Sequence, residues 1–382
     1  GHITLCQIDP KSGRQLTPSK AIWDGTGGRY PEGPHLYKKD GYYYLLISEG
    51  GTELAHGLTI ARARNIYGPY EACPRNPIMT NCNHKGENKQ IQGTGHGDFV
   101  QDTAGNWWVV FLAYRNFGGA YHHLGRETCL APVTWNEGEW PTVYGGEAID
   151  TVMRTALLPA TDMEGCPKEC ITGNANCVAR TADCAGECGR TYDFTRIKDF
   201  GPEWIHLGQP VDGAYALTDK GLALKASVVT IDGTEPTTWI GLRQTAPSCT
   251  YTAEMDCGRI GSARAGLTVY QINSEHADLC VVKSGKAFKA SLRLRLKSVD
   301  TVLGEVAMAS PRVMIRVVSD GLLYKFYVGD AAAKSLEWKY IGQVDCPLLS
   351  TEVAGGFTGV TMGMYCNGND GTVTVKSFDI NQ

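Results

Sequence analysis

Residues 27–46 read GGRYPEGPHLYKKDGYYYLL and contain two aromatic-rich runs joined by a short turn. The turn includes Asp40-Gly41, a dipeptide that favours the tight connection of an antiparallel β-hairpin. In front of the hairpin, Glu32 lies between Pro31 and Gly33. Proline fixes one backbone angle and glycine permits a bend, so the carboxyl can point into a pocket rather than along a sheet. The stretch therefore predicts a hairpin with a carboxylic acid at its entrance.

The same hairpin pattern returns further along the chain. Residues 98–113 form a second strand–turn–strand pattern around the turn 102–106. Each hairpin is followed by another strand pair, which begins near Leu58 in the first case and near Arg126 in the second. The 3.6-residue periodicity of helices is almost absent from residues 1–155. Two consecutive four-stranded sheets of this kind are typical of propeller blades, and the predicted fold class is all-β.

A second series of strands and turns occupies residues 194–382. Its spacing is typical of a β-sandwich. In Leu292–Leu296, arginines alternate with leucines, which predicts a strand with one face toward solvent. We therefore expect Arg293 and Arg295 to lie on a solvated sheet face.

Five cysteines cluster in residues 160–193, which contain little hydrophobic sequence. They are Cys166, Cys170, Cys177, Cys184 and Cys188. The Cys-x-x-x-Cys spacing favours disulfides over a zinc site, because it is not the usual zinc spacing and no histidine lies nearby. An odd number leaves at least one cysteine to bond elsewhere or stay free. The 14 cysteines of the chain are heavy usage for a reducing compartment, so a secreted protein is expected.

Length and charge limit the classes of protein to consider. A chain of 382 residues is too long for one ordinary core, so we expect residues 1–159 and 194–382 to be domains and 160–193 to link them. The formal charge of −4 gives no positive electrostatic field that would attract polyanions, which argues against nucleic acid as a partner. No apolar stretch approaches the roughly 20 residues that cross a bilayer, so no membrane span is expected.

Three ordered motifs resemble segments of glycoside hydrolase family 43. They are residues 27–37, GTGHGD at 93–98 and LGRET at 124–128. Residues 241–244 and 355–359 resemble the C-terminal β-sandwich of the β-xylosidase and α-L-arabinofuranosidase members. The resemblance implies that residues 1–159 are the C-terminal blades of a five-bladed propeller. It also implies that Glu32 is the general acid of an inverting hydrolysis.

The family places the general base, and a third carboxylate that adjusts the acid, in blades that precede the acid. Glu32 lies close to the start of this chain, so those blades are expected on a missing N-terminal segment or a separate chain. Two blades alone would expose strand edges and an apolar wall. We therefore expect a second polypeptide as partner, in addition to a xylan-derived oligosaccharide as substrate.

The resemblance gives roles to three further residues. His96, which stands among glycines, would point into the propeller channel and hold a water or a calcium ion that is largely hydrated. Arg126 would bind sugar hydroxyls near the acid through its planar guanidinium, the alternative being an exposed salt bridge with Glu127. Phe357 would wall the sugar pocket, or else belong to the sandwich core. The hydrolysis itself requires no cofactor.

Several other conspicuous residues receive no functional role. Four tryptophans lie in strand-like runs, where blade cores need large apolar residues, so we expect them in the core rather than against sugar rings. They are Trp107, Trp108, Trp135 and Trp140. His56 and His122-His123 lie in polar loops with no partner pattern, and metal binding is not expected there.

The leading hypothesis is a β-xylosidase or α-L-arabinofuranosidase that removes terminal xylose or arabinose from xylan or arabinoxylan fragments. The alternative is a non-catalytic carbohydrate-binding protein, because a lone acid cannot carry an inverting reaction. The choice between the two pentoses, and the anomeric preference, stay open at the level of sequence.

Overall fold

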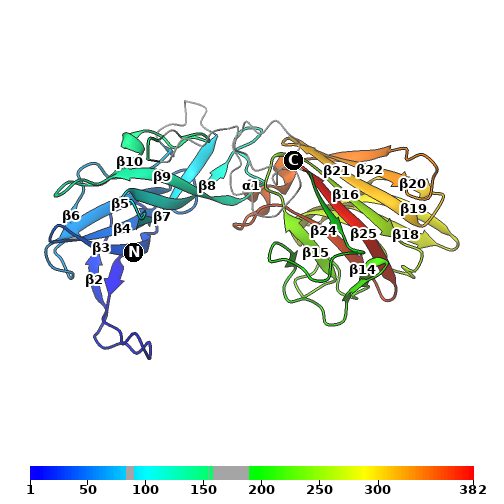
Figure 1. Ribbon diagram of the computed structural model, residues 1–382, viewed down its shortest axis with the longest axis horizontal. Helices are drawn as coiled ribbons and strands as arrows, with labels where there is room; N and C mark the ends of the chain where they lie inside the picture. Colours follow the sequence, from blue (N-terminus) through cyan, green and yellow to red (C-terminus); the bar gives the residue numbers. More distant parts are fainter. Residues whose placement is uncertain (83–89, 154, 158–188) are drawn as a thin grey trace. The chain divides into compact units, whose positions relative to one another are not determined.

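The computed structural model describes residues 1–82, 90–153, 155–157 and 189–382 (Figure 1). The chain forms two compact units, each taken over its described residues. Unit 1 comprises Gly1–Asn116 and Arg126–Thr161, and unit 2 comprises Phe117–Gly125 and Asp162–Gln382. Both are built from strands, and the one α-helix among the described residues, α1, spans Thr351–Ala354. In the described part of the chain, no helix has the length and apolar character needed to cross a bilayer.

Unit 1 contains two four-stranded antiparallel meanders, in which each strand pairs with the next along the chain. The first comprises β3 (Glu32–Lys39), β4 (Tyr42–Glu49), β5 (Gly57–Ala63) and β6 (Glu71–Ala72). The second comprises β7 (Ile91–Gln101), β8 (Trp107–Arg115), β9 (Arg126–Thr134) and β10 (Thr142–Val143). A short pair, β1 (Ile3–Leu5) and β2 (Lys20–Trp23), precedes them. Both predicted hairpins, β3–β4 and β7–β8, are confirmed.

One core serves both sheets of unit 1, because alternate residues of each strand face it. Tyr44 of β4 and Phe111 of β8 belong to the same buried cluster. Trp135, just after β9, lies in this cluster with its ring centroid 4.8 Å from that of Tyr44. Trp107 and Trp140 pack against the cluster, so these tryptophans fill the core as predicted. Burial of each large apolar side chain stabilises the unit by roughly 1.5–3 kcal/mol.

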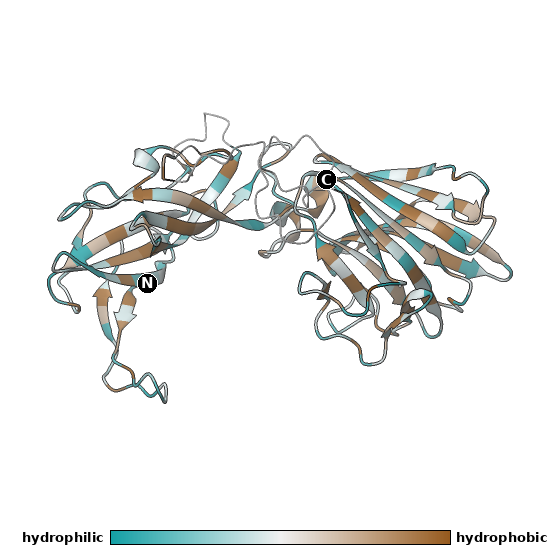
Figure 2. Ribbon diagram, viewed as in Figure 1, coloured by the Kyte–Doolittle hydropathy of each residue, from teal (hydrophilic) through white to brown (hydrophobic). Residues whose placement is uncertain are grey.

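The opposite face of the second sheet is apolar but exposed. Val100 on β7, Val110 on β8 and Leu130 on β9 are 47%, 38% and 46% exposed. Val110 and Leu130 are direct partners in the β8–β9 ladder, and Val100 and Val110 line one hollow together with His96 and Asp98. Figure 2 shows hydrophobic residues running along the strands of this sheet. Single exposed apolar residues are common on protein surfaces. Adjoining ones, as on this face, more often mark a surface that another part of a protein covers.

Unit 2 is a sandwich of two antiparallel sheets, as predicted. One sheet has the order β13-β14-β25-β16-β21-β22-β23, with β11 also paired to β25, and the other has the order β12-β15-β24-β17-β18-β19-β20. The strands of the first sheet are β11 (Gly189–Asp193), β13 (Tyr215–Thr218), β14 (Gly221–Lys225), β16 (Ser248–Asp256), β21 (Arg312–Asp320), β22 (Leu323–Asp330), β23 (Lys339–Asp345) and β25 (Thr372–Asn381). Those of the second are β12 (Ile205–His206), β15 (Trp239–Arg243), β17 (Arg264–Ile272), β18 (Glu275–Ser284), β19 (Ala287–Leu296), β20 (Val299–Met308) and β24 (Thr361–Asn367). Tyr251, Phe326 and Met364 are fully buried in the core of the sandwich.

The segment Phe117–Gly125 leaves unit 1 between β8 and β9 and belongs to unit 2. Arg243 of β15 donates a hydrogen bond of 2.7 Å to the Leu124 carbonyl. The backbone N–H of Val360 donates one of 2.8 Å to the His123 carbonyl. The sandwich is therefore assembled from two separate stretches of sequence.

The prediction of a solvated arginine face on β19 was wrong for Arg293. This side chain is buried and donates hydrogen bonds to Asp232 and to the fully buried Asp278. His276 contacts the same two carboxylates, with Nε2 at 3.0 Å from Asp232 and Nδ1 at 3.5 Å from Asp278. The loop that carries Asp232 covers the outer face of the sheet at this place. Because a buried charge needs a partner, Arg293 is paired with carboxylates there. An alternating pattern alone could not reveal that cover.

The expectation of disulfides finds no support among the described residues, whose nine cysteines are all free. Most of them are buried, as is usual for cysteines that pack as small apolar side chains. The cluster from Cys166 to Cys188 lies outside the described residues, as does most of the predicted linker 160–193. Secretion, which rested on disulfide usage, stays a prediction.

Candidate active site

Glu32 is the first residue of β3 and pairs across the sheet with Ser48 of β4. An irregularity in the ladder follows it, and Gly33 adopts φ of +57°. A Cβ at Gly33 would come within 3.0 Å of the His96 ring, so glycine is needed for both conformation and space. The side chain of Glu32 remains 44% exposed. The carboxyl is thus held at the end of a strand and is open to a ligand.

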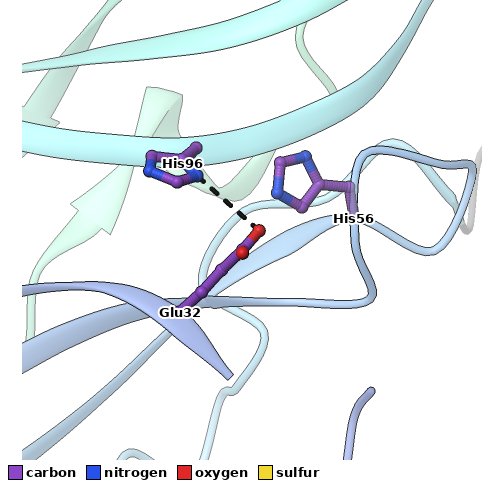
Figure 3. A group of neighbouring side chains, drawn as sticks. All are labelled: Glu32, His56 and His96. Carbon is purple, nitrogen blue, oxygen red and sulfur yellow. Dashed lines mark ion pairs between the residues drawn. The ribbon is translucent and has the colours of Figure 1, made fainter. Parts of the chain in front are cut away.

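His96 lies on β7 and comes close to Glu32 (Figure 3). Its Nδ1 is 3.7 Å from Oε1 of Glu32. The residue adopts φ of +50°, a conformation that non-glycine residues rarely adopt and that often marks functional sites. Its backbone N–H donates a hydrogen bond of 2.6 Å to Oγ of Ser48. Ser48 therefore connects the strand that carries the acid to the strand that carries the histidine.

His56 completes the group, although no role was expected for it from its sequence context. It precedes β5 and is fully buried. One oxygen of Glu32 and one ring nitrogen from each of His56 and His96 lie within 4.8 Å of one another. Figure 3 shows both imidazoles on the side toward which the Glu32 carboxyl points. Sequence reasoning missed both His56 and Ser48, because the loop and ladder that place them leave no local motif.

Arg126 opens β9, and its positive charge reaches this group. Burial is the main cause that lowers the pKa of His56, while Glu32 raises that pKa and Arg126 lowers it. Glu127, the alternative partner considered for Arg126, instead receives two hydrogen bonds from Arg115 at 2.7 and 2.8 Å. The structure thus brings together Glu32 and His96, and the charge of Arg126 acts on the third member of their group, His56.

Glu49 fixes the loop that leads to the acid. Its buried carboxylate accepts hydrogen bonds from the backbone N–H groups of Thr26 and Gly28 and from the hydroxyls of Thr26 and Thr59. These four hydrogen bonds hold the segment before Glu32 in place, because hydrogen bonds to a charged group are stronger than those between neutral groups.

A calcium ion beside His96 stays a prediction, and the described donors would leave most of its coordination sphere to water. Calcium takes six to eight oxygen ligands, whereas the group of Glu32, His56 and His96 offers one carboxylate and two imidazole nitrogens. Such a donor set suits ions that accept nitrogen ligands better.

Phe357, the fourth predicted site residue, belongs to unit 2. It lies in the loop between α1 and β24 and is 59% exposed. This exposure excludes the alternative that it is a core residue of the sandwich. Its role in a sugar pocket stays a prediction.

Comparison with known proteins agrees with this architecture. Residues 1–141 match the model for glycosyl hydrolases family 43, and residues 191–381 match the beta xylosidase C-terminal concanavalin A-like domain. The blades and the sandwich of this chain are thus the two kinds of domain that these family models describe. The chain belongs to glycoside hydrolase family 43.

Individual relatives resemble nearly the whole chain. It is 32% identical over 374 residues to the non-reducing end alpha-L-arabinofuranosidase BoGH43B of Bacteroides ovatus, covering 97% of this chain and 65% of that protein. A xylosidase/arabinosidase of Butyrivibrio fibrisolvens is 32% identical over 380 residues, with coverage of 97% and 68%. The solved structure of Bacteroides ovatus GH43B from a xyloglucan locus has a TM-score of 0.85 at 30% identity, covering 100% of this chain and 71% of that chain. The chain thus spans about two thirds of the length of these relatives.

Proposed function

We propose that this chain is the acid-bearing part of an inverting glycoside hydrolase that removes terminal xylose or arabinose from xylan or arabinoxylan oligosaccharides. The observation that carries the proposal is the Glu32 carboxyl, which is half exposed at a fixed strand end and faces two imidazoles. Relatives named as xylosidases and arabinofuranosidases support the substrate class. Arg126, whose charge reaches the same group, would orient the sugar hydroxyls.

In this reaction the protonated Glu32 donates its proton to the glycosidic oxygen as the bond to the anomeric carbon breaks. A general base removes a proton from the water that attacks the opposite face of the sugar, and solvent later returns a proton to Glu32. Inverting enzymes separate the two carboxyl groups by about 6.5–9.5 Å so that the water fits between them. The product sugar therefore has the anomeric configuration opposite to that of the substrate.

The base belongs, in this proposal, to a segment outside the present chain. Glu32 is the one carboxylate in the group of clustered donors among the described residues. The exposed apolar face of Val100, Val110 and Leu130 would be covered by a further blade. Relatives that match 97% of this chain are themselves longer single chains, so the comparisons do not support a separate second polypeptide.

The test uses the complete polypeptide that contains this chain, with xylobiose, aryl xylosides and aryl arabinofuranosides as substrates. Glu32→Gln keeps the shape of the side chain but cannot donate an acidic proton. We expect about 100- to 10,000-fold lower kcat on xylobiose, and inversion in the wild type when the products are followed by proton NMR. Glu53→Gln is the matched control, because Glu53 pairs only with Arg29 in an exposed ion pair. Undiminished hydrolysis by Glu32→Gln would refute the proposal.

The second candidate is a non-catalytic carbohydrate-binding protein. It is favoured by the presence of a single carboxylate in the described site. Calorimetric binding of xylo-oligosaccharides by the complete polypeptide, with no product after prolonged incubation, would establish it in place of the hydrolase.

A further inference from the structure

We propose that His56 is a positioning residue for the general acid, and that its Nε2 accepts a hydrogen bond from the protonated carboxyl of Glu32. The inference rests on the proposed function of Glu32. His56 is fully buried, yet its Nε2 has no hydrogen-bond partner among the described residues. A buried polar atom without a partner costs about 1–3 kcal/mol, so its retention in this place needs an explanation.

The hydrogen-bond pattern determines which ring nitrogen carries the proton. Nδ1 of His56 lies 2.9 Å from the carbonyl oxygen of Gly93. A carbonyl only accepts, so Nδ1 is the donor, and in the neutral imidazole Nε2 is then a bare acceptor. Burial lowers the pKa of His56, which agrees with the neutral form.

The ring is also fixed in its orientation. A Cβ at Gly95 would approach ring atoms of His56 to 2.5–2.6 Å, so the strand backbone lies directly against the imidazole. The backbone of His56 is bonded on both sides, from its N–H to the Glu53 carbonyl at 3.1 Å and from the Thr80 hydroxyl to its own carbonyl at 2.9 Å. The imidazole therefore cannot turn to find another partner without moving the loop.

The donor that fits this acceptor is the acid in its reactive state. Within the described group, Glu32 and His96 are the neighbours of His56, and the ring Nδ1 of His96 lies 3.7 Å from Oε1 of Glu32. A general acid must carry a proton before substrate arrives. The lone pair of Nε2 attracts the O–H of that acid and repels the ionised carboxylate. His56 would thus hold the proton-bearing oxygen until the glycosidic oxygen replaces it as acceptor.

The discriminating variant is His56→Asn in the complete polypeptide, with His56→Gln beside it. The Asn amide can still donate to the Gly93 carbonyl, but it has no acceptor at the place of Nε2, whereas the Gln carbonyl can supply one. Proton donation matters for a sugar leaving group and hardly matters for 2,4-dinitrophenolate, which leaves without a proton. We therefore expect kcat/KM of His56→Asn to fall about 100-fold on xylobiose and to change little on the dinitrophenyl xyloside. His56→Gln should recover part of the loss.

Equal losses on both substrates would show a merely structural role and would overturn the inference, as would unchanged activity on both. Hydrolysis of neither substrate by the wild type would instead mean that the proposed function fails. In that case, an NMR measurement that does not depend on hydrolysis still tests the role of His56. In protein with ¹⁵N-labelled histidine, we expect the Nε2 signal of neutral His56 to be that of an unprotonated nitrogen. At the same pH, hydrogen bonding to Glu32 should displace this signal in the wild type relative to Glu32→Ala. Identical Nε2 signals in the two proteins would contradict the proposal.

Discussion

The hydroxyl of Ser48 accepts a hydrogen bond of 2.6 Å from the backbone N–H of His96. Ser48 is also the strand partner of Glu32. One buried serine therefore fixes the distance between the acid and the histidine that faces it, although these residues come from different sheets. A change at this serine should affect the site without touching any group that contacts substrate.

Replacement of Ser48 by alanine should lower both stability and activity. The His96 N–H would lose its acceptor inside the protein, which costs about 1–3 kcal/mol in the free energy of unfolding. Urea unfolding of the complete polypeptide measures this loss, and kcat on xylobiose measures the effect on the site. Ser12→Ala is a suitable control, because the Ser12 hydroxyl bonds Asp9 in an exposed turn. Equal unfolding curves for the two variants would contradict the prediction.

Glu49→Gln should destabilise unit 1 by about 2–3 kcal/mol. The amide would turn an NH₂ group toward the N–H groups of Thr26 and Gly28, which now donate to the carboxylate. We expect thermal unfolding at a lower temperature and faster hydrogen exchange in residues 26–28. Glu53→Gln, at the exposed ion pair with Arg29, should cost less than about 1 kcal/mol. A similar effect of both substitutions would show that the four bonds to Glu49 contribute little.

The stability of unit 2 should fall as pH rises above neutrality. Burial alone would lower the pKa of His276, but its hydrogen bonds with Asp232 and Asp278 raise that pKa overall. A raised folded-state pKa gives stability that is complete below the unfolded value of about 6.5 and is lost as pH rises through the folded value. The slope should approach one proton, about 1.4 kcal/mol per pH unit. Denaturant unfolding at a series of pH values from about 6 upward measures this slope, and His276→Gln should remove it.

Glu352 should slow the exchange of backbone amide hydrogens with solvent in the segment Phe117–Gly125. Its carboxylate accepts hydrogen bonds from the backbone N–H of His122 at 2.9 Å and from the ring Nδ1 of His122 at 2.5 Å. Burial would raise the pKa of Glu352, yet these bonds lower it. Its contribution is therefore present above the unfolded value of about 4.3 and is lost as pH falls through the folded value.

Hydrogen exchange at neutral pH checks this directly. Glu352→Gln should speed exchange of the His122 amide by about tenfold, as expected for a loss near 1.4 kcal/mol. Glu337→Gln, at an exposed position between β22 and β23, should leave that amide unchanged. Protection of His122 that is the same in all three proteins would rule out the role given to Glu352.

The sequence predicted the fold well where local signals and tertiary packing agree. Asp40-Gly41 marked the first hairpin, and Trp135 was expected in a blade core, where it packs with Tyr44. Arg293 shows the limit of such reasoning, because a strand pattern tells which residues share a face but not whether a loop covers that face. The cover at Arg293 depends on Asp232, which lies far away in the sequence.

The site was predicted in part. Glu32, His96 and Arg126 were predicted from a motif that surrounds each one. Glu32 and His96 lie in one group, and the charge of Arg126 acts on its third member, His56. The roles of these residues stay predictions. His56 and Ser48 stand in ordinary strand and loop sequence, so their role appears only when β4, β5 and β7 are brought together. The glycines at 93 and 95 were a usable signal, since both make room for neighbouring rings, those of Tyr114 and His56.

The segment Phe117–Gly125 has a consequence for exchanging domains between members of the family. One family match ends at residue 141 and the next begins at residue 191. A single crossover between them leaves this segment with the blades. A transplanted sandwich would then meet foreign side chains at the backbone partners of Arg243 and Val360. Chimeras that carry residues 117–125 together with their own sandwich should fold where single-crossover chimeras fail. The part that must be transferred as a whole is therefore encoded by two separate stretches of the gene.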